Sequence, residues 1–353
     1  MNLRTPRLAT TLLAATAAWS AAATCTAADD APRPPAARSA APAVPRVYVT
    51  NEQGGTISVI DPGTGKVVET IPVGKRPRGV QVAADGRTVY VALSGSPIAG
   101  PNVKEEDLPP ADKDADGIGV VDAAAGKLTG KIDSGSDPEQ FVLGKDGKRL
   151  YVANEDTAQA AVVDLATEKV TARLKVGVEP EGVGISPDGR RVYVTSESTN
   201  EVHVIDVATD AVVGRFDVPA RPRGVAFLPD GTKGYVTCES GGVVAVFDPA
   251  NNKVLKQIRP KGENVRPMGI VVAPDGSRAY VTTGRGRTVA AIDTKTDEVV
   301  KVVPDVGARV WGIGITRDGR TLYTANGMSN DVTVIDAVTL TVIARIPTGK
   351  SPW

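Results

Sequence analysis

The stretch RVYVTNEQGGTISVID at residues 46–61 decides the fold, because the same pattern returns six more times along the chain. The copy at residues 191–206 reads RVYVTSESTNEVHVID, and the copy at residues 321–336 reads TLYTANGMSNDVTVID. In six copies the tyrosine and the final aspartate are 13 residues apart, and in the second copy they are 32 apart because 19 residues are inserted. The tyrosines are Tyr48, Tyr90, Tyr151, Tyr193, Tyr235, Tyr280 and Tyr323, and the aspartates are Asp61, Asp122, Asp164, Asp206, Asp248, Asp293 and Asp336.

Each repeat of about 42 residues alternates apolar and polar positions, as in Val202-His203-Val204-Ile205-Asp206, and contains turns such as Asp188-Gly189. This pattern predicts four short antiparallel strands in each repeat. A single sheet of this size cannot bury both of its faces, whereas a closed ring of sheets can, because each sheet covers the next. The sequence therefore predicts an all-β fold, a seven-bladed β-propeller of four-stranded antiparallel blades over residues 46–353.

The first repeat differs from the others because it starts directly at its tyrosine strand, with no inner strand before it. In a closed ring the C-terminus would supply that strand, but the sequence stops at Lys350-Ser351-Pro352-Trp353, where the strand should begin. Either the sequence is short at this end or one blade has only three strands. We expect the first blade to be incomplete and to be the weakest part of the ring.

The N-terminal residues 1–28 have the pattern of a secretory signal. Arg4 and Arg7 precede the apolar run from Leu8 to Ala23, which is too short to span a membrane. Cys25 also raises lipid attachment as an alternative, although the residues before it do not match a typical lipidation signal. Residues 29–45 are rich in Pro and Ala and are expected to be a disordered leader. These features predict a periplasmic or secreted protein with no transmembrane segment in the mature chain.

The charge of the chain argues against a nucleic-acid partner. Lys and Arg number 41, Asp and Glu number 41, and the formal net charge is zero. Removing residues 1–28, which contain two arginines and no acidic residue, leaves a net charge of −2. Such a balance gives no general electrostatic attraction to nucleic acid or to a membrane surface.

The loops that lead into the inner strands, called the lead-in loops here, contain most departures from the repeat. Together with the loops after the tyrosine strands, they are expected to surround the mouth of the central channel. Guanidinium groups suit carboxylates and phosphates, so these loops could bind a small anionic ligand or an acidic patch of a protein partner. Alternatively, the same charges could pair between blades and only fix the mouth. The candidate residues are Arg76, Arg78, Glu139, Glu179, Glu181, Arg221, Arg223, Arg266, Arg309 and Trp311.

The insertion in the second repeat, Ser94 to Asp116, contains a weak candidate for a metal site. Asp112, Asp114 and Asp116 followed by Gly117 match the first half of a calcium loop, in which alternate carboxylates reach one ion. The twelfth position is Ala123, so the usual bidentate Glu is missing. We therefore predict no cofactor, keep calcium as an alternative, and expect the insertion to be an acidic loop that contacts a partner.

Residue sets that would indicate an enzyme are hard to find. His203 is the only histidine and lies within a predicted strand, so no Ser-His-Asp set and no histidine-based metal cluster can be assembled. Cys238 is expected to be a half-buried small residue rather than a nucleophile, because no histidine can be placed beside it to activate the thiol. The repeated aspartates at the strand ends are expected to cap turns.

The repeat resembles that of the YVTN family of bacterial and archaeal β-propellers, whose signature appears as Tyr48-Val49-Thr50-Asn51 and, with one change, as Tyr151-Val152-Ala153-Asn154. The resemblance covers residues 46–353. Val178-Glu179-Pro180-Glu181-Gly182, Arg309-Val310-Trp311 and Gly349-Lys350-Ser351-Pro352-Trp353 are similar to segments of exported propellers associated with pyrroloquinoline-quinone-dependent alcohol oxidation. The resemblance implies an exported accessory protein with no catalytic residues to carry over.

These observations lead to a hypothesis of a non-enzymatic binding or scaffolding module, with a periplasmic or surface protein or a small anionic molecule as partner. Two alternatives come from other functional classes. One is a lactonase-type hydrolase that uses a calcium ion in the channel, and the other is a structural module of the envelope or surface layer. The enzyme question stays open at this point, with a binding role favoured.

Overall fold

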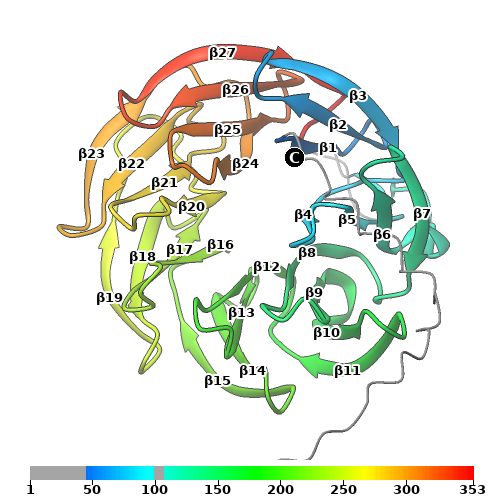
Figure 1. Ribbon diagram of the computed structural model, residues 1–353. Coiled ribbons are helices and arrows are strands. Elements are labelled where there is room, and N and C mark those ends of the chain that lie inside the picture. The colour runs from blue at the N-terminus through cyan, green and yellow to red at the C-terminus, as the bar shows by residue number, and fades with distance from the viewer. Residues whose placement is uncertain (1–44, 99–106) are drawn as a thin grey trace, which may run out of the picture. The chain divides into compact units, whose positions relative to one another are not determined.

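The computed structural model describes residues 45–98 and 107–353, and these residues form seven antiparallel sheets arranged as the blades of a propeller (Figure 1). Blades 2 to 7 have four strands each, and blade 1 has three. The predicted seven-bladed fold and the incomplete first blade are both confirmed. The innermost strands surround the centre of the ring and the outermost strands form its rim (Figure 1).

The strands follow the repeat in chain order. Blade 1 contains β1 (Val47–Asn51), β2 (Thr56–Asp61) and β3 (Lys66–Pro72), and blade 2 contains β4 (Val80–Val82), β5 (Thr88–Leu93), β6 (Gly117–Asp122) and β7 (Lys127–Ile132). Blade 3 contains β8 (Pro138–Leu143), β9 (Arg149–Asn154), β10 (Gln159–Asp164) and β11 (Lys169–Lys175), and blade 4 contains β12 (Pro180–Ile185), β13 (Arg191–Ser196), β14 (Glu201–Asp206) and β15 (Ala211–Asp217).

The remaining blades have the same arrangement. Blade 5 contains β16 (Pro222–Phe227), β17 (Gly234–Cys238), β18 (Val243–Asp248) and β19 (Lys253–Ile258), and blade 6 contains β20 (Ile270–Val272), β21 (Arg278–Thr282), β22 (Val289–Asp293) and β23 (Glu298–Val303). Blade 7 contains β24 (Val310–Ile315), β25 (Thr321–Asn326), β26 (Asp331–Asp336) and β27 (Thr341–Pro347). Two short 3-10 helices, η2 (Lys113–Ala115) and η3 (Glu155–Thr157), lie in loops.

The last residues of the chain lie beside β1, on the side where blade 1 lacks an inner strand. Asn51 and Pro352 form an antiparallel bridge, the Glu52 amide donates to Ser351 O at 2.8 Å, and the Trp353 amide donates to Thr50 O at 3.0 Å. These contacts occupy the first positions of the inner strand that the repeat predicts. They join the two ends of the ring.

The apolar core lies between neighbouring blades. One buried cluster combines Val142 and Tyr151 of blade 3 with Val192, Val194 and Ile205 of blade 4. Covering one blade with the next removes apolar surface from water, which is the main force available to a fold of this kind. The repeated aspartates serve as turn caps, as predicted: Asp206 Oδ1, for example, accepts the amides of Ala208 and Thr209, each at 3.0 Å.

Adjacent inner strands meet at a glycine and a threonine. The Gly269 amide of blade 6 donates to Thr282 Oγ1 at 2.8 Å, and this hydroxyl donates to Trp311 O of blade 7 at 2.7 Å. Thr50, Thr195 and Thr237 likewise donate to a carbonyl of the next blade, those of Arg78, Arg223 and Met268 respectively. A Cβ on Gly269 would lie 2.6 Å from Trp311 O, so the close approach requires glycine.

We predict that Gly182→Ala destabilises the ring. A Cβ at this position would overlap the carbonyl oxygen of Arg223 in the next blade, and the backbone would have to shift. The expected loss in the free energy of unfolding is about 2 kcal/mol, measured by urea denaturation. The matched control is Gly130→Ala in β7, where an added Cβ meets no atom within 4 Å. Equal losses for the two variants would contradict the proposed role of the close approach.

Candidate functional site

Seven equivalent residues, one from each lead-in loop or inner strand, form what we call the mouth ring. Each is the third residue of its lead-in segment, as Arg78 is in Arg76-Pro77-Arg78-Gly79. Where a glycine comes next, that glycine packs against the neighbouring blade. Gly79, for example, donates its amide to Glu139 O at 3.1 Å, and a Cβ on Gly312 would lie 3.2 Å from Trp353 O. The mouth ring consists of Arg78, Glu139, Glu181, Arg223, Met268, Trp311 and Trp353.

The first residues of the same loops, which we call the lead-in residues, share a backbone geometry. Six of the seven have positive φ, between 39° and 61°. In four of the loops the lead-in carbonyl accepts the amide of the glutamate that follows the neighbouring tyrosine strand, as in Glu197 N to Glu179 O at 2.9 Å. The loops that the sequence predicted to gather at one face are therefore brought together. The lead-in residues are Arg76, Asp137, Glu179, Arg221, Arg266, Arg309 and Ser351.

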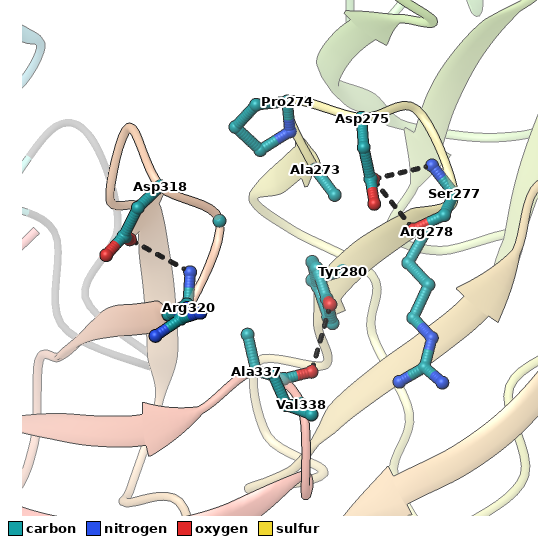
Figure 2. Close-up of a pocket in the computed structure, with 11 residues that line it drawn as sticks. Ala273, Pro274, Asp275, Ser277, Arg278, Tyr280, Asp318, Arg320, Ala337 and Val338 are labelled. Atoms are coloured by element: carbon teal, nitrogen blue, oxygen red, sulfur yellow. Dashed lines mark hydrogen bonds between the residues drawn. The ribbon is translucent and has the colours of Figure 1, made fainter.

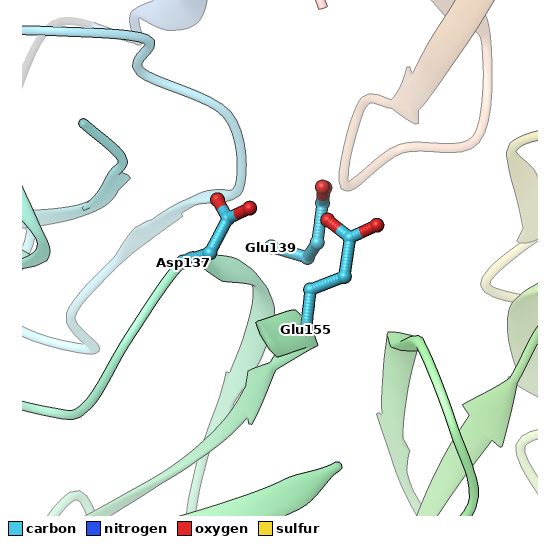
Figure 3. A group of neighbouring side chains, drawn as sticks. All are labelled: Asp137, Glu139 and Glu155. Atoms are coloured by element: carbon cyan, nitrogen blue, oxygen red, sulfur yellow. The ribbon is translucent and has the colours of Figure 1, made fainter. Parts of the chain in front are cut away.

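Three carboxylates converge on the buried guanidinium of Arg78. Asp137, Glu139 and Glu155 have carboxylate oxygens within 4.8 Å of one another (Figure 3). Arg78 is only 1% exposed; it pairs with Asp137 and Glu139, donates to Pro138 O at 3.0 Å, and lies 3.7 Å from Glu155. The guanidinium of Arg78 thus pairs with, or lies near, the three carboxylates that would have to bind a metal ion at this site.

The pKa values of two acid groups in this cluster are shifted in opposite directions. Burial opposes ionisation of Asp137, but the charge of Arg78 and a hydrogen bond from Ser94 hold the pKa of Asp137 below its usual value. Burial raises the pKa of Glu155 to about 7, with Arg78 opposing and Asp137 adding to the shift. Glu155 is therefore a group of this cluster whose charge changes near neutral pH.

A second cluster lies at blades 4 and 5, around Arg223. Its guanidinium pairs with Glu181 and Glu197, and with Glu239 at 2.7 Å. Arg221 also pairs with Glu197 and lies 3.7 Å from Glu239. Burial raises the pKa of Glu197 to about 7, while Arg223 keeps the pKa of Glu239 below its usual value despite burial. The buried Arg223 and the exposed Arg221 thus pair with glutamates of neighbouring blades, as in the pairing alternative.

The opposite part of the mouth, at blades 6, 7 and 1, is aromatic and basic. Trp311 and Trp353 stack with ring centroids 6.1 Å apart and an interplanar angle of 23°. The guanidinium of Arg309 lies 4.7 Å from the Trp311 ring centroid, and that of Arg223 lies 5.5 Å away. Within the described part of the chain Arg309 forms no salt bridge, whereas Arg266 lies 3.6 Å from Glu239.

A cavity of about 290 Å³ opens at this mouth. Five residues of the mouth ring line it: Glu181, Arg223, Met268, Trp311 and Trp353. Gln81 and Gln140 complete its polar part, and Gln81 also joins β4 to β8 through hydrogen bonds with Phe141 O and the Leu143 amide. The cavity is therefore charged on one side and apolar on the other.

Seven of the ten predicted residues fall into two groups; of the other three, Arg221 and Arg266 lie beside Glu239, and Glu179 accepts a hydrogen bond from the Ser198 hydroxyl. Arg78, Arg223, Glu139 and Glu181 are buried in pairs, and Arg76 pairs with Glu52 at 3.1 Å. Trp311 lines the cavity, and the guanidinium of Arg309 lies over the face of the Trp311 ring. The sequence reasoning did not single out Met268 and Trp353 as site residues, although both occupy the same position of the lead-in loop as Trp311, and that alignment is a usable signal.

The carboxylates of the half calcium loop do not share one ligand site among the described residues. Asp112 pairs with Lys75 at 2.6 Å, while Asp116 accepts the amides of Gly95 at 2.7 Å and Asp137 at 3.0 Å. Asp114 is exposed. Glu105 and Glu106 of the insertion lie outside the described residues.

His203 and Cys238 lie within strands. His203 is buried in β14, and burial lowers its pKa. Cys238 is fully buried with a free thiol, and burial raises its pKa to about 12, which leaves little thiolate at neutral pH. No helix among the described residues is long and apolar enough to cross a membrane.

Comparisons with known proteins support the fold. A family model described as the choice-of-anchor I domain matches residues 36–218. Hydrazine synthase from Kuenenia stuttgartiensis is similar in structure, with 22% identity, a TM-score of 0.71, and coverage of 82% of this chain and 92% of that chain. A functionally unknown protein from Desulfotomaculum acetoxidans has 16% identity, a TM-score of 0.70, and coverage of 86% and 98%. No curated protein matches the sequence.

We predict that Arg78→Gln destabilises the protein far more than Arg76→Gln. Removing Arg78 leaves buried carboxylates without their cation, at an expected cost of about 3 kcal/mol at pH 8. Arg76 is half-buried with one glutamate partner, so its loss should cost about 1 kcal/mol or less. Urea denaturation at pH 8 measures both values. A loss for Arg78→Gln no larger than that for Arg76→Gln would show that the cluster does not depend on this cation.

We also predict a pH-dependent effect of Glu155→Gln. The folded-state pKa of Glu155 is raised to about 7, so its contribution to stability is present at low pH and is lost as the pH rises through 7. Glutamine stays neutral, and the free energy of unfolding of the variant relative to the wild type should therefore increase between about pH 4.5 and pH 8. Thermal or urea denaturation across this range measures the difference. A difference that stays flat with pH would contradict the assignment.

Proposed function

The chain belongs to the choice-of-anchor I domain family, and from this premise we propose that it is an exported, non-enzymatic binding module. Its ligand is a small anion with a flat apolar body, held at the mouth of the channel. A propeller fold alone does not give a function, because many functions share it. The proposal therefore rests on the cavity, on the residues that line it, and on Arg309, which lies against the lining residue Trp311 without lining the cavity itself.

The apolar side of the cavity suits a flat ligand. Trp311 and Trp353 are half-buried, stack on each other, and line the cavity beside Met268. Aromatic side chains combine large contact area with few rotatable bonds, and they are common in small-molecule sites. A volume of about 290 Å³ is close to the lower end of the range for such sites. The rigid ring around the cavity lowers the entropic cost of binding.

Arg309 carries the argument for an anion. Its guanidinium lies on the face of Trp311 and forms no salt bridge with any described residue, in contrast with Arg78 and Arg223. Burial lowers the pKa of Arg309, although Glu52 opposes the shift, as expected for a cation that has lost water without gaining a close carboxylate. A carboxylate or phosphate of a ligand would supply that partner through bidentate hydrogen bonds.

The lactonase alternative has one observation in its favour, the carboxylate cluster of Asp137, Glu139 and Glu155. Arg78 pairs with two of these carboxylates and lies 3.7 Å from the third, so a calcium ion would have to displace a buried guanidinium. This competition makes the binding proposal the stronger of the two. Metal analysis of the purified protein separates them, since the hydrolase requires stoichiometric calcium and lactone turnover.

The location and partners follow from the sequence rather than from the site. The signal pattern of residues 1–28 supports export to the periplasm or beyond. The similarity to propellers associated with pyrroloquinoline-quinone-dependent oxidation supports an accessory role beside such a system. An acidic patch of a periplasmic or surface protein could supply the same anionic group, so a protein partner and a small molecule share one recognition chemistry at Arg309.

The test uses benzoate, its neutral isostere benzamide and the cation benzylammonium as probes in ligand-observed NMR titrations. We expect benzoate to bind about tenfold more tightly than benzamide, because one charge-assisted interaction is gained. Arg309→Gln should remove that preference, and Trp311→Leu should weaken benzoate and benzamide alike. Native mass spectrometry of gently isolated protein should recover an anionic small molecule or an acidic protein.

The matched control is Arg190→Gln, which removes one positive charge at a side chain that is 84% exposed and does not line the cavity. It should leave all three titrations unchanged. Equal affinity for benzoate and benzamide in the wild type, or a preference for benzoate that survives Arg309→Gln, would refute the proposed anion site.

A further inference from the structure

Two junctions between neighbouring blades, those of blades 3 and 4 and of blades 5 and 6, share a polar contact away from the mouth. At the junction of blades 3 and 4, the residue two places before the tyrosine of one blade meets a turn residue of the next. Arg149 pairs with both carboxylate oxygens of Asp210, at 2.8 and 2.9 Å, and Tyr151 donates its hydroxyl to Asp210 at 3.1 Å. Asp210 is the fourth residue after Asp206, the last residue of β14.

The junction of blades 5 and 6 repeats this contact with the equivalent residues. Lys233 pairs with Asp297 at 2.7 Å, and the Tyr235 hydroxyl donates to the same carboxylate at 3.0 Å. At the junction of blades 4 and 5 the equivalent turn residue is Asn252, whose side-chain oxygen lies 3.4 Å from the Tyr193 hydroxyl. The contact of a basic residue and a tyrosine with one carboxylate is therefore complete at two junctions, whereas at the junction of blades 4 and 5 Arg191 donates to Pro249 O instead.

The junction of blades 6 and 7 keeps the basic residue and the tyrosine but lacks the carboxylate. The equivalent turn residue is Leu340, the fourth residue after Asp336, and it is buried in the apolar core. Tyr280 donates to Ala337 O at 3.2 Å instead (Figure 2). Among the described residues, Arg278 forms no salt bridge; its side chain lies close enough to the Tyr280 hydroxyl to oppose the rise in the pKa of that group, and no carboxylate contacts its guanidinium in Figure 2.

A cavity of about 370 Å³ opens at this junction, and it shares no lining residue with the cavity at the mouth. Arg278, Tyr280, Ala337 and Val338 line it, together with the turns at Asp275 and Asp318 and the exposed Arg320. Neither aspartate forms a salt bridge with Arg278. Asp275 accepts the amide and hydroxyl of Ser277, and the charge of Arg278 contributes only a small part of the lowering of its pKa. Asp318 accepts the amide of Arg320 and the hydroxyl of Thr316.

The charged groups beside the junction tyrosines also differ between the junctions. Burial raises the pKa of Tyr151 and of Tyr235, and the carboxylates of Asp210 and Asp297 raise them further. Burial also raises the pKa of Tyr280, but there the opposing effect of Arg278 exceeds the contribution of Asp275, whereas at Tyr151 the effect of Asp210 exceeds the opposing effect of Arg149. The junction of blades 6 and 7 is thus the more positive one at its tyrosine.

We propose that the cavity between blades 6 and 7 binds a carboxylate, which Arg278 holds as Arg149 holds Asp210. The ligand is a small carboxylic acid or an Asp or Glu side chain of a partner protein, since both present the same group. The turns at Asp275 and Asp318 border the cavity, whose volume of about 370 Å³ has room for a ligand a few atoms long. The geometry of the other junctions supplies the binding mode.

The test uses three probes: glutarate, the peptide acetyl-Ala-Asp-Ala-amide, and its neutral counterpart acetyl-Ala-Asn-Ala-amide. Amide chemical shifts of Ala337 and Val338 are followed by NMR at constant ionic strength, so that bulk salt does not change. We expect saturable shifts with glutarate or with the Asp peptide and none with the Asn peptide. Binding of glutarate alone assigns a free acid as ligand, and binding of the Asp peptide assigns a protein side chain.

Two variants test the assignment in opposite ways. Arg278→Gln should weaken carboxylate binding about tenfold or more, in line with the loss of a charge-assisted pair. Leu340→Asp should fill the site from within the chain and abolish the saturable shifts. The backbone already suits this change, because φ is 57° at Leu340, 48° at Asp210 and 54° at Asp297.

Arg190→Gln again serves as the control for loss of a distant positive charge and should bind as the wild type does. Should Leu340→Asp fail to fold, Arg278→Gln alone carries the test. The proposal is wrong if the wild type gives no saturable shifts, if the Asn peptide binds as well as the Asp peptide, or if Arg278→Gln retains the wild-type affinity. None of these results bears on the cavity at the mouth.

Discussion

The ring depends on the contact between adjacent inner strands, where a glycine of one blade touches a carbonyl of the next. At blades 6 and 7 the Gly269 amide donates to Thr282 Oγ1, which donates to Trp311 O. One hydroxyl therefore fixes a strand of its own blade and a carbonyl of its neighbour. Because glycine has no Cβ, this carbonyl can lie at hydrogen-bond distance, and the spacing between blades is set at the channel rather than at the rim.

This contact uses only the backbone of the residue that supplies the carbonyl, so its side chain is left free to vary. Arg78, Arg223, Met268 and Trp311 all supply the carbonyl to an equivalent threonine. The same backbone position can thus hold a buried cation, a thioether or an indole at the mouth without altering the ring. A rigid frame with variable residues at one face is the usual arrangement for binding sites.

The sequence predicted the fold well because the repeat specifies every strand locally, and the missing strand of blade 1 was visible as a gap in the pattern. The gathering of the lead-in loops followed from the alternating strand directions. The burial of Arg78 among Asp137, Glu139 and Glu155 could not be predicted, because it depends on distances between two blades after the ring has closed. Arginines of equivalent loops therefore differ in their partners: Arg78 is buried among carboxylates, whereas Arg309 forms no salt bridge with any described residue.

A repeated structure also supplies its own comparison for each departure from the pattern. Asp210 and Leu340 occupy the same turn position with the same left-handed backbone, so the fold does not require either side chain. The carboxylate at Asp210 neutralises Arg149, while the leucine leaves Arg278 beside a cavity. A cation kept where its partner has been lost costs desolvation without a compensating pair. That cost is removed when a ligand brings the anion, which is why Arg278 and Arg309, two cavity-side arginines without a salt bridge among the described residues, mark the surfaces where this propeller is expected to bind.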